Sequence, residues 1–251
     1  DIPFPKNFGI GFIVLFVSIT IGTLVFWFYR VKPATNIFRH RTIKDFITET
    51  KQIVTGHRNF QKYLLSRIFF CASLPGMGLY AIYCQNKFNF DISEAGIFTV
   101  LNVIASGTTS YLVGKLGDRW GHKSGMMIAY VAHFSAVILA INAQNMYWVY
   151  GIFMAIGAGQ GAFMPSAMNL VYDFAEERDT KTYMAIIDSF MAPFVVLFLA
   201  GIGFLVQQNN YSLVLNILGG CLFFSIILLH FLVQDPRHSN EPAIYVDGFS
   251  S

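Results

Sequence analysis

The chain has 251 residues, of which 55% are hydrophobic and 12% are charged, and its mean hydropathy is +0.52. A water-soluble domain of this length would need more charged residues to cover its surface, so the composition excludes that class and indicates a membrane protein that crosses the bilayer several times. The formal net charge of +3 is small and gives no reason to expect a nucleic-acid partner.

Seven apolar stretches are long enough to cross a hydrocarbon core of roughly 30 Å, which takes about 20 helical residues. In chain order they cover residues 8–28, 63–84, 96–113, 125–141, 147–172, 183–206 and 211–233. In lipid each segment must satisfy its own backbone hydrogen bonds, and the alternating pattern of a barrel strand is absent. The sequence therefore predicts an all-α polytopic membrane helix bundle with seven transmembrane helices.

Lysine and arginine are distributed unevenly among the predicted loops. Eight lie between the first and second spans, three between the third and fourth, two between the fifth and sixth, and one in the tail. The opposite side holds Lys6 and Lys87, and Arg67 lies inside a span. The positive-inside rule predicts an amino end outside and a carboxyl end in the cytoplasm, and we expect the membrane to be the cell (inner) membrane.

The segment 29–62 is much longer than any other connection. Apolar residues recur in it at helical spacing among basic ones: Ile37, Phe38, Ile43, Phe46, Ile47 and Ile53. This pattern predicts one or two amphipathic helices on the cytoplasmic membrane surface. We therefore divide the chain into a first helix at 1–28, a basic cytoplasmic linker at 29–62, a six-helix block at 63–233 and a cytoplasmic tail at 234–251.

The segment 114–123, between the third and fourth spans, reads GKLGDRWGHK. Its glycines and charges predict a ten-residue turn that joins two membrane helices. Gly114, Gly117 and Gly121 allow the backbone to bend. Asp118 can accept hydrogen bonds from the free N–H groups at the start of a helix, where the helix dipole favours negative charge.

This segment resembles the signature loop of the major facilitator superfamily, which lies between the second and third helices of each six-helix half. The matching residues are Gly114, Asp118, Arg119, Gly121 and Lys123, and His122 stands where the family usually has arginine or lysine. The segment also has the required position within the block 63–233. The resemblance implies that this block is the carboxyl-terminal half, that 29–62 corresponds to the loop between halves, and that helix 8–28 is the last of a truncated amino-terminal half.

The fifth span carries small or polar residues at every fourth position: Gly157, Gly161, Pro165, Asn169 and Asp173. Small residues permit close helix packing in lipid, and a proline can kink a helix. Both a cavity-lining helix and a simple packing stripe agree with this pattern. Pro75 predicts a similar break in the second span. Polar residues that could line a cavity, or instead bond neighbouring helices, are Asn102, Ser106, Thr109, Gln160 and Asn169.

Arg67 and Asp188 are ionisable residues inside predicted spans, which makes them functional candidates. They lie at similar depths from the cytoplasmic ends of the second and sixth spans, at about 1.5 Å of rise per residue. We hypothesise an ion pair that breaks or re-pairs as the bundle rocks. Two alternatives stay open. Arg67 snorkels to the headgroups while Asp188 meets water, or the two residues act directly on substrate or protons.

Enzyme motifs for zinc, nucleotide or nucleophile chemistry are not found in the sequence, so we expect no enzyme activity, no cofactor and no metal site. The family resemblance implies a secondary active transporter of small solutes that works by alternating access and is coupled to an ion or proton gradient. A seven-helix membrane receptor and a non-transporting membrane scaffold are the alternatives. The expected partners are the lipid bilayer, an unknown small-molecule substrate, and a missing amino-terminal half or a partner chain.

Overall fold

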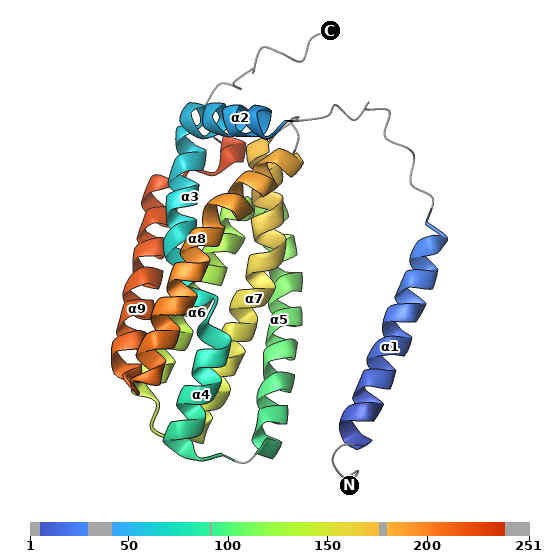
Figure 1. Cartoon of the computed structure of the whole chain (residues 1–251), viewed down its shortest axis with the longest axis vertical. Helices are drawn as coiled ribbons and strands as arrows, with labels where there is room; N and C mark the ends of the chain where they lie inside the picture. Colours follow the sequence, from blue (N-terminus) through green and yellow to red (C-terminus); the bar gives the residue numbers. More distant parts are fainter. Residues whose placement is uncertain (1–5, 30–41, 91, 176–179, 239–251) are drawn as a thin grey trace. The chain divides into compact units, whose positions relative to one another are not determined.

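The structure is a computed structural model that describes residues 6–29, 42–90, 92–175 and 180–238 (Figure 1). The chain forms two compact units, Asp1–Thr42 and Ile43–Ser251. The boundary between them falls inside the segment 29–62. The described residues are mostly helical and contain no β-strand, so the all-α fold class is confirmed.

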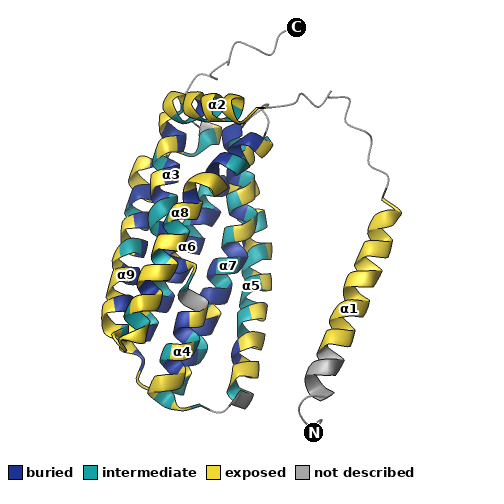
Figure 2. Cartoon of the chain, in the orientation of Figure 1, coloured by how far each residue is buried: buried dark blue, intermediate teal, exposed yellow. Residues whose placement is uncertain are grey.

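The first unit contains the helix α1 (Lys6–Trp27), which covers most of the predicted span 8–28. Its described side chains are exposed along the whole helix (Figure 2). The hydroxyl groups of Ser18, Thr20 and Thr23 donate to backbone carbonyls four residues earlier, at 2.8–2.9 Å. These bonds satisfy the polar side chains inside the helix itself, as a lipid-facing helix requires.

The second unit is a helix bundle. It begins with α2 (Ile43–Gly56) and α3 (Arg58–Phe70), passes through a 3₁₀ turn (Cys71–Ser73) and enters α4 (Gly76–Phe88). The remaining helices are α5 (Ile92–Trp120), α6 (His122–Asn142), α7 (Met146–Ala175), α8 (Thr180–Gln207) and α9 (Tyr211–Ile227). A π-helical turn (Leu228–Leu232) and a 3₁₀ turn (Pro236–His238) follow.

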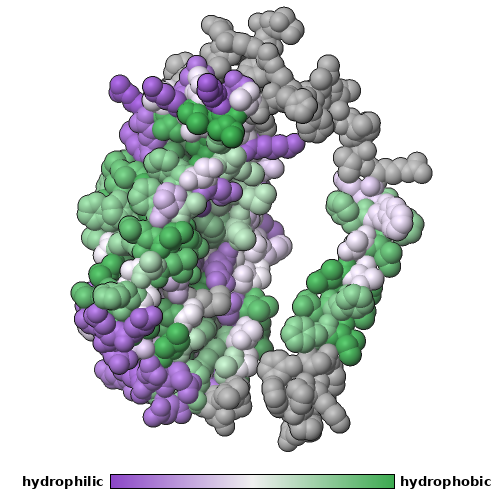
Figure 3. All heavy atoms as spheres, in the orientation of Figure 1, coloured by the Kyte–Doolittle hydropathy of each residue, from purple (hydrophilic) through white to green (hydrophobic). Residues whose placement is uncertain are grey.

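Five helical stretches among the described residues are long and apolar enough to cross a membrane: Arg58–Phe88, Glu94–Trp120, His122–Asn142, Thr180–Gln207 and Tyr211–Leu232. The 30-residue α7 is not one of them. In the bundle an apolar band lies between two hydrophilic ends (Figure 3). An integral membrane bundle is therefore supported, and the number of seven spans stays a prediction.

The second predicted span is interrupted as its proline indicated. α3 ends at Phe70, the 3₁₀ turn follows, and Pro75 stands directly before α4. Proline fixes its own φ and lacks an N–H group, so a regular helix does not continue through it without losing a hydrogen bond. α3 and α4 nevertheless form one candidate span, Arg58–Phe88, by length and composition.

α2 lies across one end of the bundle (Figure 1). Its Ile53 is buried and its Phe46 and Val54 pack against the core, whereas Ile43 and Ile47 are exposed. Part of the apolar face is thus covered by the bundle, and part is free to meet a membrane surface. Ile37 and Phe38, which also belonged to the predicted amphipathic pattern, lie outside the described residues.

Small residues bring α5, α6 and α7 into close contact. A Cβ atom at Gly157 or Gly161 of α7 would overlap the backbone of Asn102 or Ser106 of α5. On the other side of α7, a Cβ at Gly159 would overlap the imidazole of His133 of α6. The glycine stripe therefore serves helix packing, one of the two interpretations that the sequence left open.

Candidate functional site

The predicted ten-residue turn at 114–123 is wrong in its extent. α5 continues to Trp120 and α6 begins at His122, so Gly121 alone joins them. Gly114 and Gly117 are helical residues. A helix can continue past the edge of its apolar stretch into water. The charged residues Lys115, Asp118 and Arg119 therefore extend α5 instead of ending it.

Gly121 is the glycine of this segment whose backbone conformation favours glycine over other residues. Its φ is +83°, a left-handed value that side chains disfavour, and a Cβ there would overlap the carboxylate of Asp235. At Gly117 a Cβ would lie 2.5 Å from Nδ1 of His122, so this glycine makes room for the imidazole. At Gly114 a Cβ would meet no atom within 4 Å.

Asp118 does not have the predicted capping role. It lies in the last turn of α5 and is exposed, and the N-cap residue of α6 is Gly121, which has no side chain to cap the helix. The carbonyl of Gly121 accepts a hydrogen bond from Oγ of Ser124, at 2.6 Å. Arg119 is also exposed. Lys123 donates from Nζ to the carbonyl oxygen of His230, at 3.1 Å, and so ties the start of α6 to the turn after α9.

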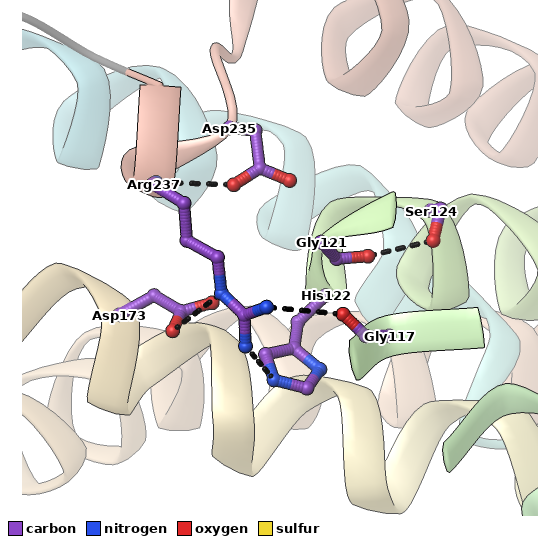
Figure 4. A network of polar contacts seen from close by, with 7 residues as sticks. All are labelled: Gly117, Gly121, His122, Ser124, Asp173, Asp235 and Arg237. Carbon is purple, nitrogen blue, oxygen red and sulfur yellow. Dashed lines mark hydrogen bonds and ion pairs between the residues drawn. The ribbon is translucent and has the colours of Figure 1, made fainter. Parts of the chain in front are cut away.

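Arg237, beyond the last helix, holds this end of the bundle together (Figure 4). Its Nε donates to Oδ1 of Asp173 at the end of α7, at 3.2 Å, and one terminal nitrogen donates to the carbonyl of Gly117, at 3.2 Å. The other terminal nitrogen makes a short contact with Nε2 of His122. One guanidinium thus joins α5, α6 and α7 to the segment that follows α9.

The contact with Arg237 explains why histidine can replace a basic residue at position 122. A guanidinium has donors only, so Nε2 of His122 must accept, and the imidazole must be neutral in this contact. Arginine or lysine at 122 could not accept a hydrogen bond. This partnership was not predicted, and the signal that could have pointed to it is the pair of charged residues Asp235 and Arg237 directly after the last span.

Two further hydrogen bonds between distant segments bring the segment after α9 against the start of α3. Asn59 Nδ2 donates to the carbonyl of Gln234, and the N–H of Gln234 donates to Oδ1 of Asn59, both at 2.8 Å. The α5–α6 connection, α2, the start of α3 and the segment after α9 therefore gather at one end of the bundle, which we call the basic end.

Arg67 lies in α3 and faces the interior of the bundle. Its guanidinium carbon lies 4.6 Å from the centre of the Phe163 ring of α7. It does not form an ion pair with Asp188, whose side chain is exposed on α8. Arg67 therefore does not snorkel out of the bundle in this structure, and pairing with Asp188 in another conformation stays a prediction.

Aromatic side chains surround this arginine. The Phe70 ring stacks on Tyr130 of α6, with centroids 4.2 Å apart, and on Phe163, at 5.1 Å. Tyr63, one turn before Arg67, is fully buried, and neither its hydroxyl nor the Nε of Arg67 has a hydrogen-bond partner. Tyr130 accepts a hydrogen bond from Ser66 at 3.4 Å.

A cavity of about 90 Å³ lies beside this aromatic stack. Its lining includes Phe70, Ser73, Tyr80, His133, Gln160 and Phe163. Gln160 is thus the predicted cavity residue that the structure places at this cavity. Among the described residues, no group of three or more His, Cys, Asp or Glu side chains could hold a metal ion.

The other predicted cavity residues lie elsewhere. Asn102 donates from Nδ2 to the carbonyl of Phe153, at 3.2 Å, so it links α5 to α7. The backbone of Ser106 contacts Gly161. Thr109 and Asn169 are half-buried on α5 and α7 and do not line this cavity.

The fold and the sites together define a polytopic α-helical membrane protein with a small cavity inside its helix bundle. The sequence model of the Major Facilitator Superfamily matches residues 64–246, well over half of the chain. The chain belongs to this family, as its signature segment predicted.

A curated relative is the tetracycline resistance protein, class B, of Escherichia coli, with 21% identity over 158 residues. The match covers 61% of this chain and 38% of that protein, so the chain spans less than half of its relative. No solved structure matches the chain.

Proposed function

We propose that the chain is the carboxyl-terminal half of a secondary active transporter that moves small solutes by alternating access. The observation that carries this proposal is the cavity between α3, α6 and α7, inside an apolar bundle of a transporter family. Its lining mixes aromatic rings with Ser73, His133 and Gln160, which is the mixture expected of a small-molecule site. Substrate sites of such transporters lie near the bilayer midplane, between two halves.

We propose that a second six-helix half, on a preceding segment or on a separate chain, covers α5 and α8. The most apolar stretches of Glu94–Trp120 and Thr180–Gln207 are only 11% buried, whereas those of the other three spans are at least 39% buried. The exposed faces include Val100, Val103 and Tyr111 on α5, and Val196, Leu197 and Phe204 on α8. Faces of this size need cover from protein or lipid.

The direction of insertion is part of the same proposal. The basic end carries α2, Lys123 and Arg237, so the positive-inside rule supports its placement on the cytoplasmic side of the cell membrane.

Asp188, exposed on α8, would lie where the second half packs. We propose it as the carboxylate that binds a coupling proton or ion, because ionisable residues in membrane spans are energetically costly and usually have a function.

The test is flux through the full-length protein in proteoliposomes with an imposed proton gradient. The solutes should include tetracycline, because the name of the relative points to it, together with organic anions, cations and neutral molecules. We expect at least one solute to move only while the gradient is present, and a protonophore to stop it. A protein that moves no solute under either proton or sodium gradients would be a scaffold or a receptor instead.

A further inference from the structure

We propose that Arg67 binds the negatively charged group of the transported solute, so that the substrate class is a small organic anion. This inference rests on the proposed transport function. It starts from the position of Arg67, an arginine inside a candidate membrane span, where ionisable residues are rare. Arg67 is the tenth residue of the 31-residue span Arg58–Phe88 and lies inside the bundle.

Nε of Arg67 is buried and has no hydrogen-bond partner among the described residues, while the side chain as a whole is half-buried. A guanidinium carries five N–H donors that suit a carboxylate or a phosphate. The carboxylate of Asp188 attracts this guanidinium but forms no ion pair with it, and a cation inside a helix bundle without a direct anionic partner is unfavourable. The ring face of Phe163 compensates only in part, because a cation–π contact is weaker than a charged hydrogen bond.

The hydroxyl of Tyr63 is a second unused group at the same place. Tyr63 lies four residues before Arg67 on α3, so both side chains share one face of the helix. The side chain is fully buried and its hydroxyl has no partner. An anion that binds Arg67 could accept a hydrogen bond from this hydroxyl as well, which would satisfy both orphan groups at once.

The neighbouring cavity provides the space for the rest of the solute. It shares Phe70 and Phe163 with the surroundings of Arg67. Aromatic rings and Gln160 line it, and its volume of about 90 Å³ admits a small group only. The geometry therefore fits a compact carboxylate or phosphate compound whose charge meets Arg67.

The experiment measures anion binding to the purified full-length protein by calorimetry and by the unfolding temperature. The probes are inorganic phosphate, a monocarboxylate and a dicarboxylate, each organic anion being paired with its neutral amide. Arg67→Gln removes the charge, and Arg67→Lys keeps the charge but loses the planar fork. Arg58→Gln is the matched control, because Arg58 is an exposed arginine of the same helix.

We expect at least one anion, but not its amide, to bind and stabilise the unaltered protein and the Arg58→Gln variant. Binding should weaken roughly tenfold or more in Arg67→Gln and less in Arg67→Lys. Without any anion, Arg67→Gln should unfold at the same or a higher temperature, because a charge inside the bundle without a direct anionic partner has been removed. An unaltered unfolding temperature of Arg67→Gln would show that its weaker binding does not result from a loss of folding.

Other results would overturn the inference. Equal anion binding by Arg67→Gln and the unaltered protein would place the anion elsewhere. Lower stability of Arg67→Gln, matched by Asp188→Asn and restored by exchanging the two charges, would assign Arg67 to an internal ion pair. Gradient-driven flux of neutral or cationic solutes that does not need Arg67 would remove the inference and leave the transport function standing. Anion binding at Arg67 without flux of any solute would do the reverse.

Discussion

His122 and Arg237 show how a single residue change can be accommodated at a family signature. Arg237 donates to the carboxylate of Asp173, the carbonyl of Gly117 and the imidazole of His122. A second cation at position 122 would repel it. Gly121 and Asp235 lie directly against each other in the same network, so the α5–α6 connection is fitted to the segment after α9.

Replacing His122 by lysine should weaken the basic end. His122→Lys restores the basic character usual in the family but puts a like charge beside Arg237, and we expect a loss of about 1 kcal/mol of unfolding free energy. His122→Gln is the control, because the side-chain oxygen of glutamine can accept from Arg237. Thermal unfolding of the purified full-length protein measures both. Equal stability of the two variants would show that the contact contributes nothing.

The backbone of Gly121 gives a second prediction at this scale. Gly121→Ala introduces a methyl group that overlaps the Asp235 carboxylate, at a φ of +83° that alanine disfavours. We expect a loss of about 1–3 kcal/mol. Gly114→Ala is the matched control in the same signature, because its methyl group would meet no neighbour and alanine favours a helix. Chemical or thermal unfolding should separate the two variants clearly, and similar stabilities would contradict the assigned role.

At the scale of elements, the contact of α5 with α7 depends on two glycines. Gly161→Ala would press a methyl group against the backbone of Ser106, which cannot move away as a flexible side chain could. We expect a loss of about 1–3 kcal/mol. Gly107→Ala on α5 is the control, because no atom lies within 4 Å of its Cβ position. It should be neutral or stabilise the helix by up to about 1 kcal/mol. A neutral Gly161→Ala would mean that the helices do not approach this closely.

The helices were largely predictable from the sequence, because apolar length alone identifies a membrane helix. The predicted spans 125–141 and 183–206 lie within α6 and α8 and differ from them by three residues or fewer at each end. The end of α5 was not predictable in this way. Charged residues such as Lys115 and Arg119 mark the edge of the apolar stretch, and a helix can continue past that edge into water.

The parts of the candidate site that could be predicted from the sequence are those that a short local pattern identifies. The signature residues and the glycine stripe could be recognised because each pattern is short. The partner of Arg67 could not be deduced from depth along the helices, because depth leaves the rotation of each helix open. Arg67 turned out to face Phe163, and Asp188 is exposed. The contacts of Arg237 span 64 to 120 residues of sequence, and no local pattern encodes them.

For the whole molecule, the distribution of charge and exposure supports one arrangement. The basic end collects α2, the connection at Gly121 and Arg237, and the exposed apolar faces of α5 and α8 are available for a second half. The proposed transport function requires that the cavity between α3, α6 and α7 open toward the space between the halves. Transport requires that this cavity be reached from one side of the membrane at a time.

Accessibility of residue 160 is the most direct test of that requirement. In the full-length protein with its native cysteines replaced, Gln160→Cys should react with a membrane-impermeant maleimide from one side only. An imposed gradient or a bound substrate should lower the rate from that side and raise it from the other by several-fold. Reaction from neither side under any condition, or equal reaction from both sides at once, would contradict alternating access through this cavity.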